Sequence, residues 1–250
     1  MRNLLLLLAL LPSLRSCLAQ LPGGPAAAEA PAAVFSAPAY RATLHRFAAR
    51  RQRLAARYRQ AGTAAGRRAC LAEARTLLLT ALDSTIFPAW EGTPWAFYGQ
   101  SWEPRRGTIA CGYFVTTTLH DAGLKLQRSL LAKQASEVII KNLTAEANIH
   151  RYRDLSQADF VRAVQQLGPG LYVLGLDYHA GFLRVREGGA VQMIHSSYLG
   201  TAAVTLEAAD SAEALDSKYR VVGKVSADDA LLRAWLLGQP LAVRGASVRK

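Results

Sequence analysis

The stretch that decides the fold covers residues 170–195 and reads GLYVLGLDYHAGFLRVREGGAVQMIH. It contains β-forming apolar runs, and Glu187-Gly188-Gly189 between two of them is typical of a hairpin turn. Five runs of this kind are expected to be short strands, at residues 171–176, 180–186, 190–195, 203–206 and 219–225. The C-terminal half is therefore predicted to be a meander of antiparallel strands.

The chain before this stretch follows the helical period instead. The expected helices cover residues 39–60, 67–83, 111–122, 130–142 and 156–167, and a last helix covers residues 227–237. Ser156 with Asp159, and Ser226 with Asp229, have the spacing of capping boxes, and Gly238 marks a helix end. Because a block of helices precedes a block of strands, the sequence predicts an α+β fold.

Length and composition exclude several classes of protein. The 250 residues are 51% hydrophobic and 8% aromatic, which supplies a core and excludes a chain that is disordered overall. The counts of 19 Gly, 10 Pro and 3 Cys are too low for a collagen-like or disulfide-dense protein. One globular domain with an appendage fits these numbers.

The net charge of +12 comes from one segment of the chain. Residues 40–75 contain ten Arg and one Glu, whereas residues 76–250 contain eighteen Lys or Arg and sixteen Asp or Glu. We expect a basic helical segment at 40–66, whose arginine stripe is either a solvated face or a contact for an anionic envelope polymer or membrane surface through helix 40–60. Aromatic residues are not interleaved with these arginines as base stacking requires, so no nucleic-acid partner is expected.

The N-terminus has the layout of a secretory signal peptide over residues 1–19. Arg2 precedes an unbroken apolar run from Leu4 to Leu11, which is too short to span a bilayer. A Pro/Ala/Gly linker at 20–39 follows. We expect export to the periplasm or the extracellular space, with two alternatives: a lipoprotein anchored at Cys17, or a buried N-terminal helix. No transmembrane helix is expected elsewhere in the sequence.

Cys111 is the candidate nucleophile. It follows Gly107-Thr108-Ile109-Ala110 at an expected helix start, where free amides and the helix dipole favour a thiolate and could hold an oxyanion. The alternative is a buried apolar side chain. Cys70 shares a helical stripe with Ala74, Leu77 and Ala81 and is expected to be buried, although two cysteines could pair in an oxidising compartment.

Two histidines lie at the ends of adjacent expected strands. His179 precedes the strand at 180–186, and His195 ends the strand at 190–195. Neighbouring strands are about 5 Å apart, so one histidine could take the thiol proton while the other orients it. Asp177 is a competing orienter. A zinc site of Cys111, His179 and His195 is the chemical alternative, but no close ligand pair supports it, and we expect neither a metal nor another cofactor.

The order of these residues resembles the NlpC family of cell-wall cysteine peptidases. Residues 179–183, HAGFL, are similar to the family's His-Val-Gly-Ile-Tyr strand, and residues 192–195, QMIH, are similar to its third element. Residues 92–99, GTPWAFYG, resemble the family's Gly-Thr-Pro-Tyr-x-x-Gly-Gly approach to the cysteine. The resemblance covers residues 67–200.

This resemblance implies a papain-like α+β domain at 67–250 with a helical insertion at about 125–168. It implies a monomeric cysteine peptidase or amidase that cleaves an amide bond in a peptide or peptidoglycan-like substrate through Cys111, His179 and His195. Trp95 and Tyr98 are the expected substrate-binding residues. The family's Asp-Cys-Ser-Gly becomes Ala-Cys-Gly-Tyr at 110–113. The alternative is a non-catalytic envelope-binding module that keeps the fold.

Overall fold

The structure is a computed structural model that describes residues 35–245. The expected signal peptide at 1–19, the linker up to residue 34 and the lipoprotein alternative at Cys17 lie outside the described residues. The described chain belongs to one compact unit that begins at Phe35. Among its helices, none combines the length and the apolar character that crossing a bilayer requires.

The structure confirms an α+β architecture with helices first. The helices are α1 (Ala37–Gln60), α2 (Ala64–Ala81), α3 (Phe87–Trp90), α4 (Cys111–Asp121), α5 (Arg128–Ala132), α6 (Ser136–Leu143), α7 (Gln157–Gln166) and α8 (Asp229–Leu237). The strands are β1 (Ile149–Arg153), β2 (Gly170–Leu176), β3 (Ala180–Val185), β4 (Val191–Ser196), β5 (Val204–Ala208) and β6 (Tyr219–Lys224). A π-helical turn, η1 (Leu82–Ile86), joins α2 to α3.

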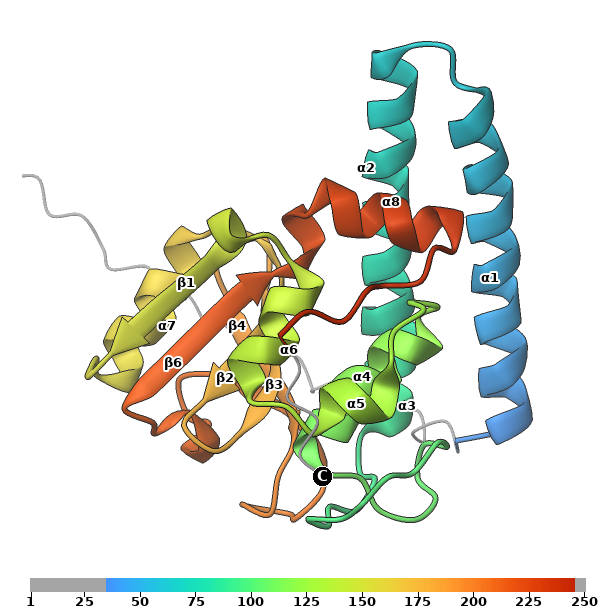
Figure 1. Cartoon of the computed structure of the whole chain (residues 1–250). Helices are drawn as coiled ribbons and strands as arrows, with labels where there is room; N and C mark the ends of the chain where they lie inside the picture. The colour runs from blue at the N-terminus through green and yellow to red at the C-terminus, as the bar shows by residue number, and fades with distance from the viewer. Residues whose placement is uncertain (1–34, 246–250) are drawn as a thin grey trace, which may run out of the picture. The chain divides into compact units, whose positions relative to one another are not determined.

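The six strands form one antiparallel sheet in the order β1-β6-β2-β3-β4-β5. The expected meander is confirmed, because β2, β3, β4 and β5 follow one another in sequence and in the sheet (Figure 1). The hairpin turn between β3 and β4 contains Gly188 and Gly189 at φ 87° and 90°, values that glycine adopts without strain. Pairing of Gly181 with His195 sets the register of this hairpin.

Strand β1 corrects the expectation that the insertion at about 125–168 is made only of helices. Ile149 is buried, residues 150–153 alternate between half-buried and exposed side chains, and Arg151 pairs with Val221 of β6. This pattern is compatible with an edge strand, but the arginines in the segment make the strand hard to recognise from the sequence. The expected helix at 130–142 is also two short helices, α5 and α6.

The cap of the last helix also differs from the expectation. Asp228, rather than Ser226, is the N-cap of α8, and its carboxylate accepts a hydrogen bond from the Leu231 amide at 2.7 Å. The Ser226 hydroxyl instead accepts from the Leu171 amide of β2. Gly238 ends the helix in the left-handed region as expected, at φ 65°.

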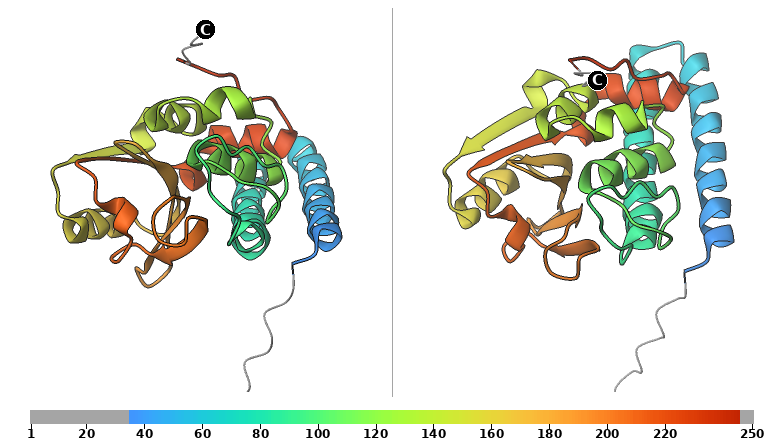
Figure 2. Two further views of the ribbon diagram at one scale, coloured as in Figure 1. Left: turned by 90° about the horizontal axis from the view of Figure 1, so that it is seen from below. Right: turned by 60° about the horizontal axis from the view of Figure 1, so that its bottom comes forward.

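Helices cover both faces of the sheet (Figure 2). On one face, Phe160 and Val164 of α7 pack against Tyr172 and Leu183. On the other face lies α4, whose residues Gly112–Leu119 are all buried. Because α4 is enclosed by the sheet and by the other helices, its N-terminus has a fixed position relative to β3 and β4.

Helices α1 and α2 form an antiparallel hairpin whose turn stands away from the sheet (Figure 1). Ser36 caps α1, with Pro38 in its first turn, so this helix begins within the expected linker. The Tyr40 hydroxyl donates to Asp121 at the end of α4 at 2.6 Å. Arg51 donates to the Gly123 carbonyl, and these contacts attach the base of the hairpin to the core.

Cys70→Ala should destabilise the fold, because the Cys70 side chain is 5% exposed on the expected stripe with Ala74, Leu77 and Ala81, all buried. The loss should be about 1–2 kcal/mol, as for a small buried side chain. Thermal unfolding measures the effect. Cys111→Ala is the matched control, because Cys111 is half-buried and its midpoint should stay within a degree or so of wild type. Equal midpoints for both variants would contradict the packing role.

Candidate active site

Cys111 is the first residue of α4, after Ala110 in extended conformation. No side chain caps this helix end. A side-chain carbon at Gly112 would collide with the Ala132 carbonyl oxygen at the end of α5. The residue after the cysteine must therefore be glycine in this fold.

The chain that leads to Cys111 is tied to the sheet edge. The Trp95 amide donates to the Ala202 carbonyl at 2.8 Å, and the Ile109 amide donates to the Pro94 carbonyl at 2.9 Å. A side-chain carbon at Gly99 would lie 2.6 Å from the Ile109 nitrogen, so only glycine fits this crossing. The glycine that ends the GTPWAFYG motif therefore has a packing role.

A buried hydrogen bond links the cysteine segment to the histidine strand. The Ser196 hydroxyl donates to the Ile109 carbonyl at 2.7 Å. Ile109 lies two residues before Cys111, and Ser196 directly follows His195, so this contact sets the distance between the helix start and β4. Both side chains are fully buried, so the hydrogen bond is shielded from competing water.

The two candidate histidines are in direct contact. Nε2 of His179 lies 2.9 Å from Nδ1 of His195, with the rings nearly perpendicular at 81°. His179 directly precedes β3, and Gly181, two residues later, is paired with His195. A side-chain carbon at Gly181 would lie 2.9 Å from the His195 Cβ. The glycine therefore leaves room for the base of the His195 side chain on the neighbouring strand.

Glu207 of β5 extends this row, although sequence reasoning did not find it. Its Oε1 lies 2.7 Å from Nε2 of His195, whose side chain is 3% exposed. The pairing of His195 with Thr205 places Glu207 diagonally across from His195. Because alternate residues of a strand lie on the same face of the sheet, the sequence of residues 204–208 indicated which of these side chains share a face. The register between β4 and β5 was not readable from the sequence.

Cys111 and His179 open into the same pocket, with a volume of about 410 Å³. Its other walls come from the segment between α5 and α6, from the loop between β2 and β3, and from Tyr219 of β6. Glu137 on this wall is held by Tyr219, Lys141 and Arg151. A substrate carbonyl that enters this pocket could therefore approach both the Cys111 sulfur and the His179 imidazole.

Burial controls the protonation of this site. It raises the pKa of the Cys111 thiol, and backbone hydrogen bonds from Ala180, Gly112 and Cys111 itself oppose the rise. Burial, with His195 beside it, lowers the pKa of His179 from 6.5 to about 3. Burial also lowers the pKa of His195, with Glu207 opposing. The expected thiolate is therefore corrected to a neutral thiol beside a neutral imidazole, because desolvation outweighs the helix-end amides.

Asp177 does not bond to His179. Its carboxylate accepts from the Ser217 hydroxyl at 2.8 Å and from the Lys218 and Tyr219 amides at 2.9 and 3.2 Å. These contacts attach the loop between β2 and β3 to the chain before β6. Asp177 thus stabilises the loop that carries His179 and is not its orienter.

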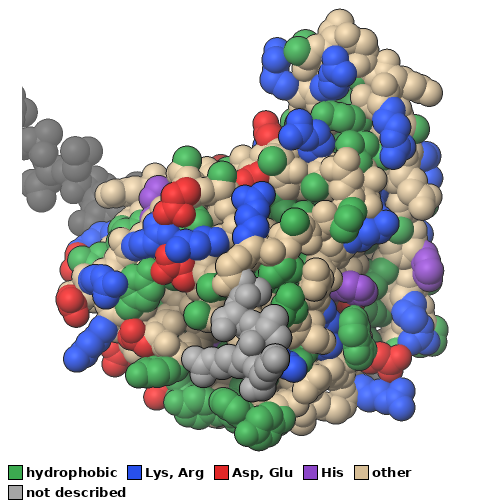
Figure 3. Space-filling view, viewed as in Figure 1, with side chains coloured by type: hydrophobic (Ala, Val, Ile, Leu, Met, Phe, Trp, Pro, Cys, Tyr) green, Lys and Arg blue, Asp and Glu red, His purple; other side chains and the backbone are tan. Residues whose placement is uncertain are grey.

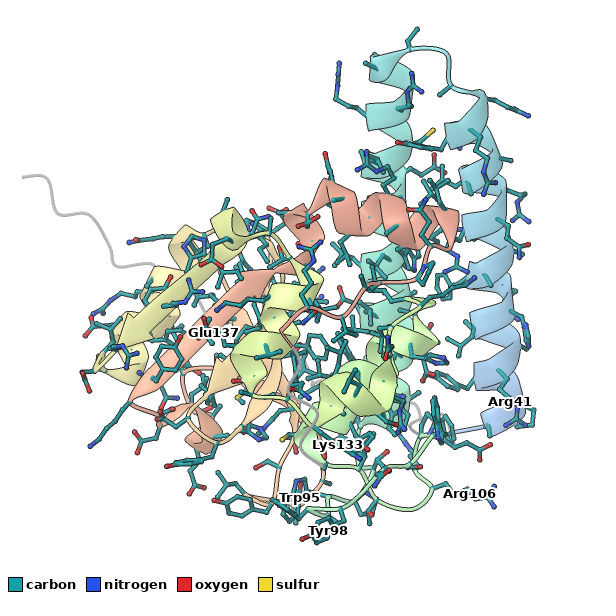
Figure 4. The ribbon with its side chains drawn as sticks, in the orientation of Figure 1. Arg41, Trp95, Tyr98, Arg106, Lys133 and Glu137 are labelled. Carbon is teal, nitrogen blue, oxygen red and sulfur yellow. The ribbon has the colours of Figure 1, made fainter. Side chains whose placement is uncertain are left out.

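The expected substrate residues lie beside the pocket rather than in it. Figure 4 shows Trp95 and Tyr98 together at the lower edge, below Lys133 and Glu137. The Trp95 ring contacts Tyr198, and Tyr198 and His179 both line a second pocket. Tyr98 is 84% exposed and borders a third hollow. Neither side chain lines the pocket of Cys111. Figure 3 shows hydrophobic side chains gathered at the lower edge of the molecule.

Cys70 and Cys111 are both free thiols, so they do not form the disulfide that was left open. Within residues 35–245, no group of three or more His, Cys, Asp or Glu side chains has an arrangement that could hold a metal ion. The zinc alternative therefore gains no support from the described part of the chain.

Comparison of the chain with protein-family models, with curated proteins and with solved structures gives no significant match. The resemblance to the NlpC family therefore remains a prediction from the motifs around Cys111, His179 and His195.

The buried neutral histidine should make stability depend on pH. The unfolded chain binds a proton at His179 near 6.5, whereas the folded chain binds it near 3. Between these values the unfolded state holds more protons, so the free energy of unfolding should fall as the pH falls through this window. His179→Gln should reduce the slope, measured by urea unfolding at successive pH values.

His45→Gln is the matched control for this slope, because His45 is exposed on α1. Its pH dependence should follow the wild-type protein. A His179→Gln protein with the wild-type slope would show that His179 titrates normally in the folded state.

Proposed function

We propose that this chain is an exported cysteine hydrolase that cleaves an amide bond through Cys111, His179 and His195. The observation that carries the proposal is one pocket lined by both the Cys111 thiol and the His179 imidazole, whose Nε2 is in contact with a second imidazole. A peptide or peptidoglycan-like substrate and a papain-like fold are part of this proposal, and the resemblance to the NlpC family supports both. The periplasmic or extracellular location rests on the sequence of residues 1–19.

Acylation begins with proton transfer from the Cys111 thiol to Nδ1 of His179, because Nε2 is in contact with His195. The sulfur attacks the carbonyl carbon, and the carbonyl π electrons move to oxygen. When this intermediate collapses, the C–N bond breaks and the leaving amine takes the proton from Nδ1. The product is a thioester on Cys111 and a free amine.

Deacylation uses the same base. A water molecule gives a proton to Nδ1 of His179 and attacks the thioester carbon, the C–S bond breaks, and the proton returns to the sulfur. Amides at the start of α4 can stabilise the oxyanion in both steps, since the Gly112 and Cys111 amides are directed at the sulfur. No cofactor enters this scheme.

The neutral thiol and neutral imidazole predict general-base catalysis rather than a preformed ion pair. Because burial holds the pKa of His179 at about 3, the imidazole remains a proton acceptor in mildly acidic solution. The acidic limb of the rate profile should therefore lie well below the ordinary histidine value of about 6.5. The apparent value belongs to the coupled thiol and imidazole together.

A non-catalytic envelope-binding module is the alternative, and the residues that flank Cys111 are its support. The structure supplies a packing reason for Gly112, which weakens that argument. The two proposals differ in whether the Cys111 sulfur accepts an acyl group. They can therefore be separated without knowledge of the natural substrate.

p-Nitrophenyl acetate provides this test because it acylates an activated thiol and releases a coloured phenolate. The wild-type protein should release a burst of one phenolate per chain, with the acetyl group on Cys111 by peptide mass spectrometry. His179→Ala should slow the burst by about 100-fold or more, since it removes the general base. Cys111→Ala should give no burst.

Cys70→Ala is the matched thiol control for the burst, because Cys70 is buried on α2 and outside the pocket. Its burst should match that of the wild-type protein. Acetylation of Cys111 no faster than that of a simple thiol in solution would favour the non-catalytic module.

We further propose that the arginines of the α1–α2 hairpin bind an anionic polymer. Six exposed arginines lie on its distal half, Arg50, Arg53, Arg57, Arg59, Arg67 and Arg68. Within residues 35–245, Arg57 forms an ion pair with Glu73 at 2.7 Å, and the other five arginines form none. Figure 3 shows basic side chains on the projecting end of the molecule. Guanidinium groups bind phosphate and carboxylate in two-point contacts, which fits a polyanion.

A polymer fits this hairpin better than a bilayer. An interfacial helix needs exposed large apolar side chains to enter the lipid. In the described chain the most exposed large apolar residues lie at 97–102, 155, 178 and 198, outside α1 and α2. The apolar faces of the two helices are buried, as at Leu54 and Leu77, or half-buried. The charged side chains are therefore the most accessible groups of the hairpin.

Polyphosphate is the probe for this surface, and its binding should weaken steeply with added salt. A fourfold Arg→Gln variant of the hairpin should bind at least about tenfold more weakly, since each arginine contributes to the local potential. The hairpin positions are Arg53, Arg59, Arg67 and Arg68. The control has the same charge change at Arg106, Arg162, Arg186 and Arg233, which are exposed elsewhere.

The control protein should keep most of its affinity for polyphosphate. Equal losses in both variants would mean that net charge alone attracts the polymer. Binding to phosphatidylglycerol vesicles without binding to polyphosphate would replace the polymer with a membrane surface.

A further inference from the structure

The geometry points to Glu207 as a positioning residue that fixes which nitrogen of His179 carries the lone pair. This inference rests on the proposed function for its catalytic consequence, and its structural part can be tested without activity. Glu207 lies two imidazoles away from the sulfur, at the far end of the row His179, His195, Glu207.

The direction of each hydrogen bond follows from the carboxylate. An ionised Glu207 can only accept, so Nε2 of His195, at 2.7 Å, must carry a proton and donate it. In a neutral ring the other nitrogen then has a lone pair. Nδ1 of His195 is therefore an acceptor.

The same reasoning gives the direction of the hydrogen bond between His195 and His179. Since Nδ1 of His195 accepts, Nε2 of His179, at 2.9 Å, must donate. A neutral His179 with its proton on Nε2 has its lone pair on Nδ1. This is the nitrogen that the proposed mechanism needs free to accept the thiol proton.

Without the carboxylate, both rings could carry their protons on Nδ1. His195 would then donate to His179, and Nδ1 of His179 would already hold a proton. Burial makes this choice important, because both imidazoles are held in the neutral form and neither can resolve the conflict by gaining a second proton. The half-exposed carboxylate at the end of the row thus determines which nitrogen of His179 carries the proton.

The backbone around His179, His195 and Glu207 holds these three side chains in position. Gly181 leaves room for the Cβ of His195, and strand pairing of His195 with Thr205 brings Glu207 within reach. The Glu207 side chain is 32% exposed, so water contacts one end of the row while His195 is shielded. The carboxylate therefore contacts a buried ring from a position that solvent can reach.

Histidine labelled with ¹⁵N reports the tautomers directly by NMR near neutral pH. In the wild-type protein both His179 and His195 should carry their protons on Nε2. In Glu207→Gln, the side-chain amide can donate to Nε2 of His195, so a substantial population should carry protons on Nδ1 of both rings. The burst rate with p-nitrophenyl acetate should fall about tenfold or more, as expected when the base holds the wrong proton.

Glu187→Gln is the matched control, since Glu187 is exposed in the turn at the opposite end of the β3–β4 hairpin. It should keep the wild-type tautomers and burst rate. Thermal midpoints of both variants check that the fold is intact. Protons on Nδ1 of the wild-type rings, or unchanged tautomers and rate in Glu207→Gln, would overturn the inference. Correct wild-type tautomers without any burst would reject the hydrolase while leaving the role of Glu207 in place.

Discussion

The hydrogen bond from the Ser196 hydroxyl to the Ile109 carbonyl is the constraint on which the site depends. It joins a residue next to His195 to a residue two positions before Cys111, across 87 positions of sequence. Phe114 of α4 packs on Phe182 of β3 just behind it. Helix start and histidine strand therefore move as one body, which is the preorganisation that a thiol and its base require.

Burial gives this site its chemical character. The desolvation that raises the pKa of Cys111 and lowers that of His179 leaves an uncharged pair in the resting protein. Charge appears only when the thiol proton moves, in an environment already lined with amides and backed by Glu207. The thiol of such an enzyme would react slowly with most electrophiles in solution and faster with an acyl group that enters the pocket.

Local signals in the sequence were sufficient for most of the fold. Alternating apolar runs and the glycine turn at 187–189 gave the strands of the meander, and helical periodicity gave α1, α2, α4 and α7. Strand β1 was missed because its pairing with β6 joins segments about 70 residues apart, and two arginines hide its short pattern. The break between α5 and α6 was missed as well, since the close approach of Ala132 to Gly112 is a tertiary contact.

The sequence by itself identified the residues on which the proposed chemistry rests, because a cysteine at a helix start and histidines at strand ends are local features of Cys111, His179 and His195. Tertiary structure decided how those residues are joined. Strand register, which no local pattern encodes, placed Glu207 behind His195, and it separated Asp177 from His179. Protonation was also a tertiary outcome, because the pKa of a side chain depends on how much water the surrounding fold removes from it.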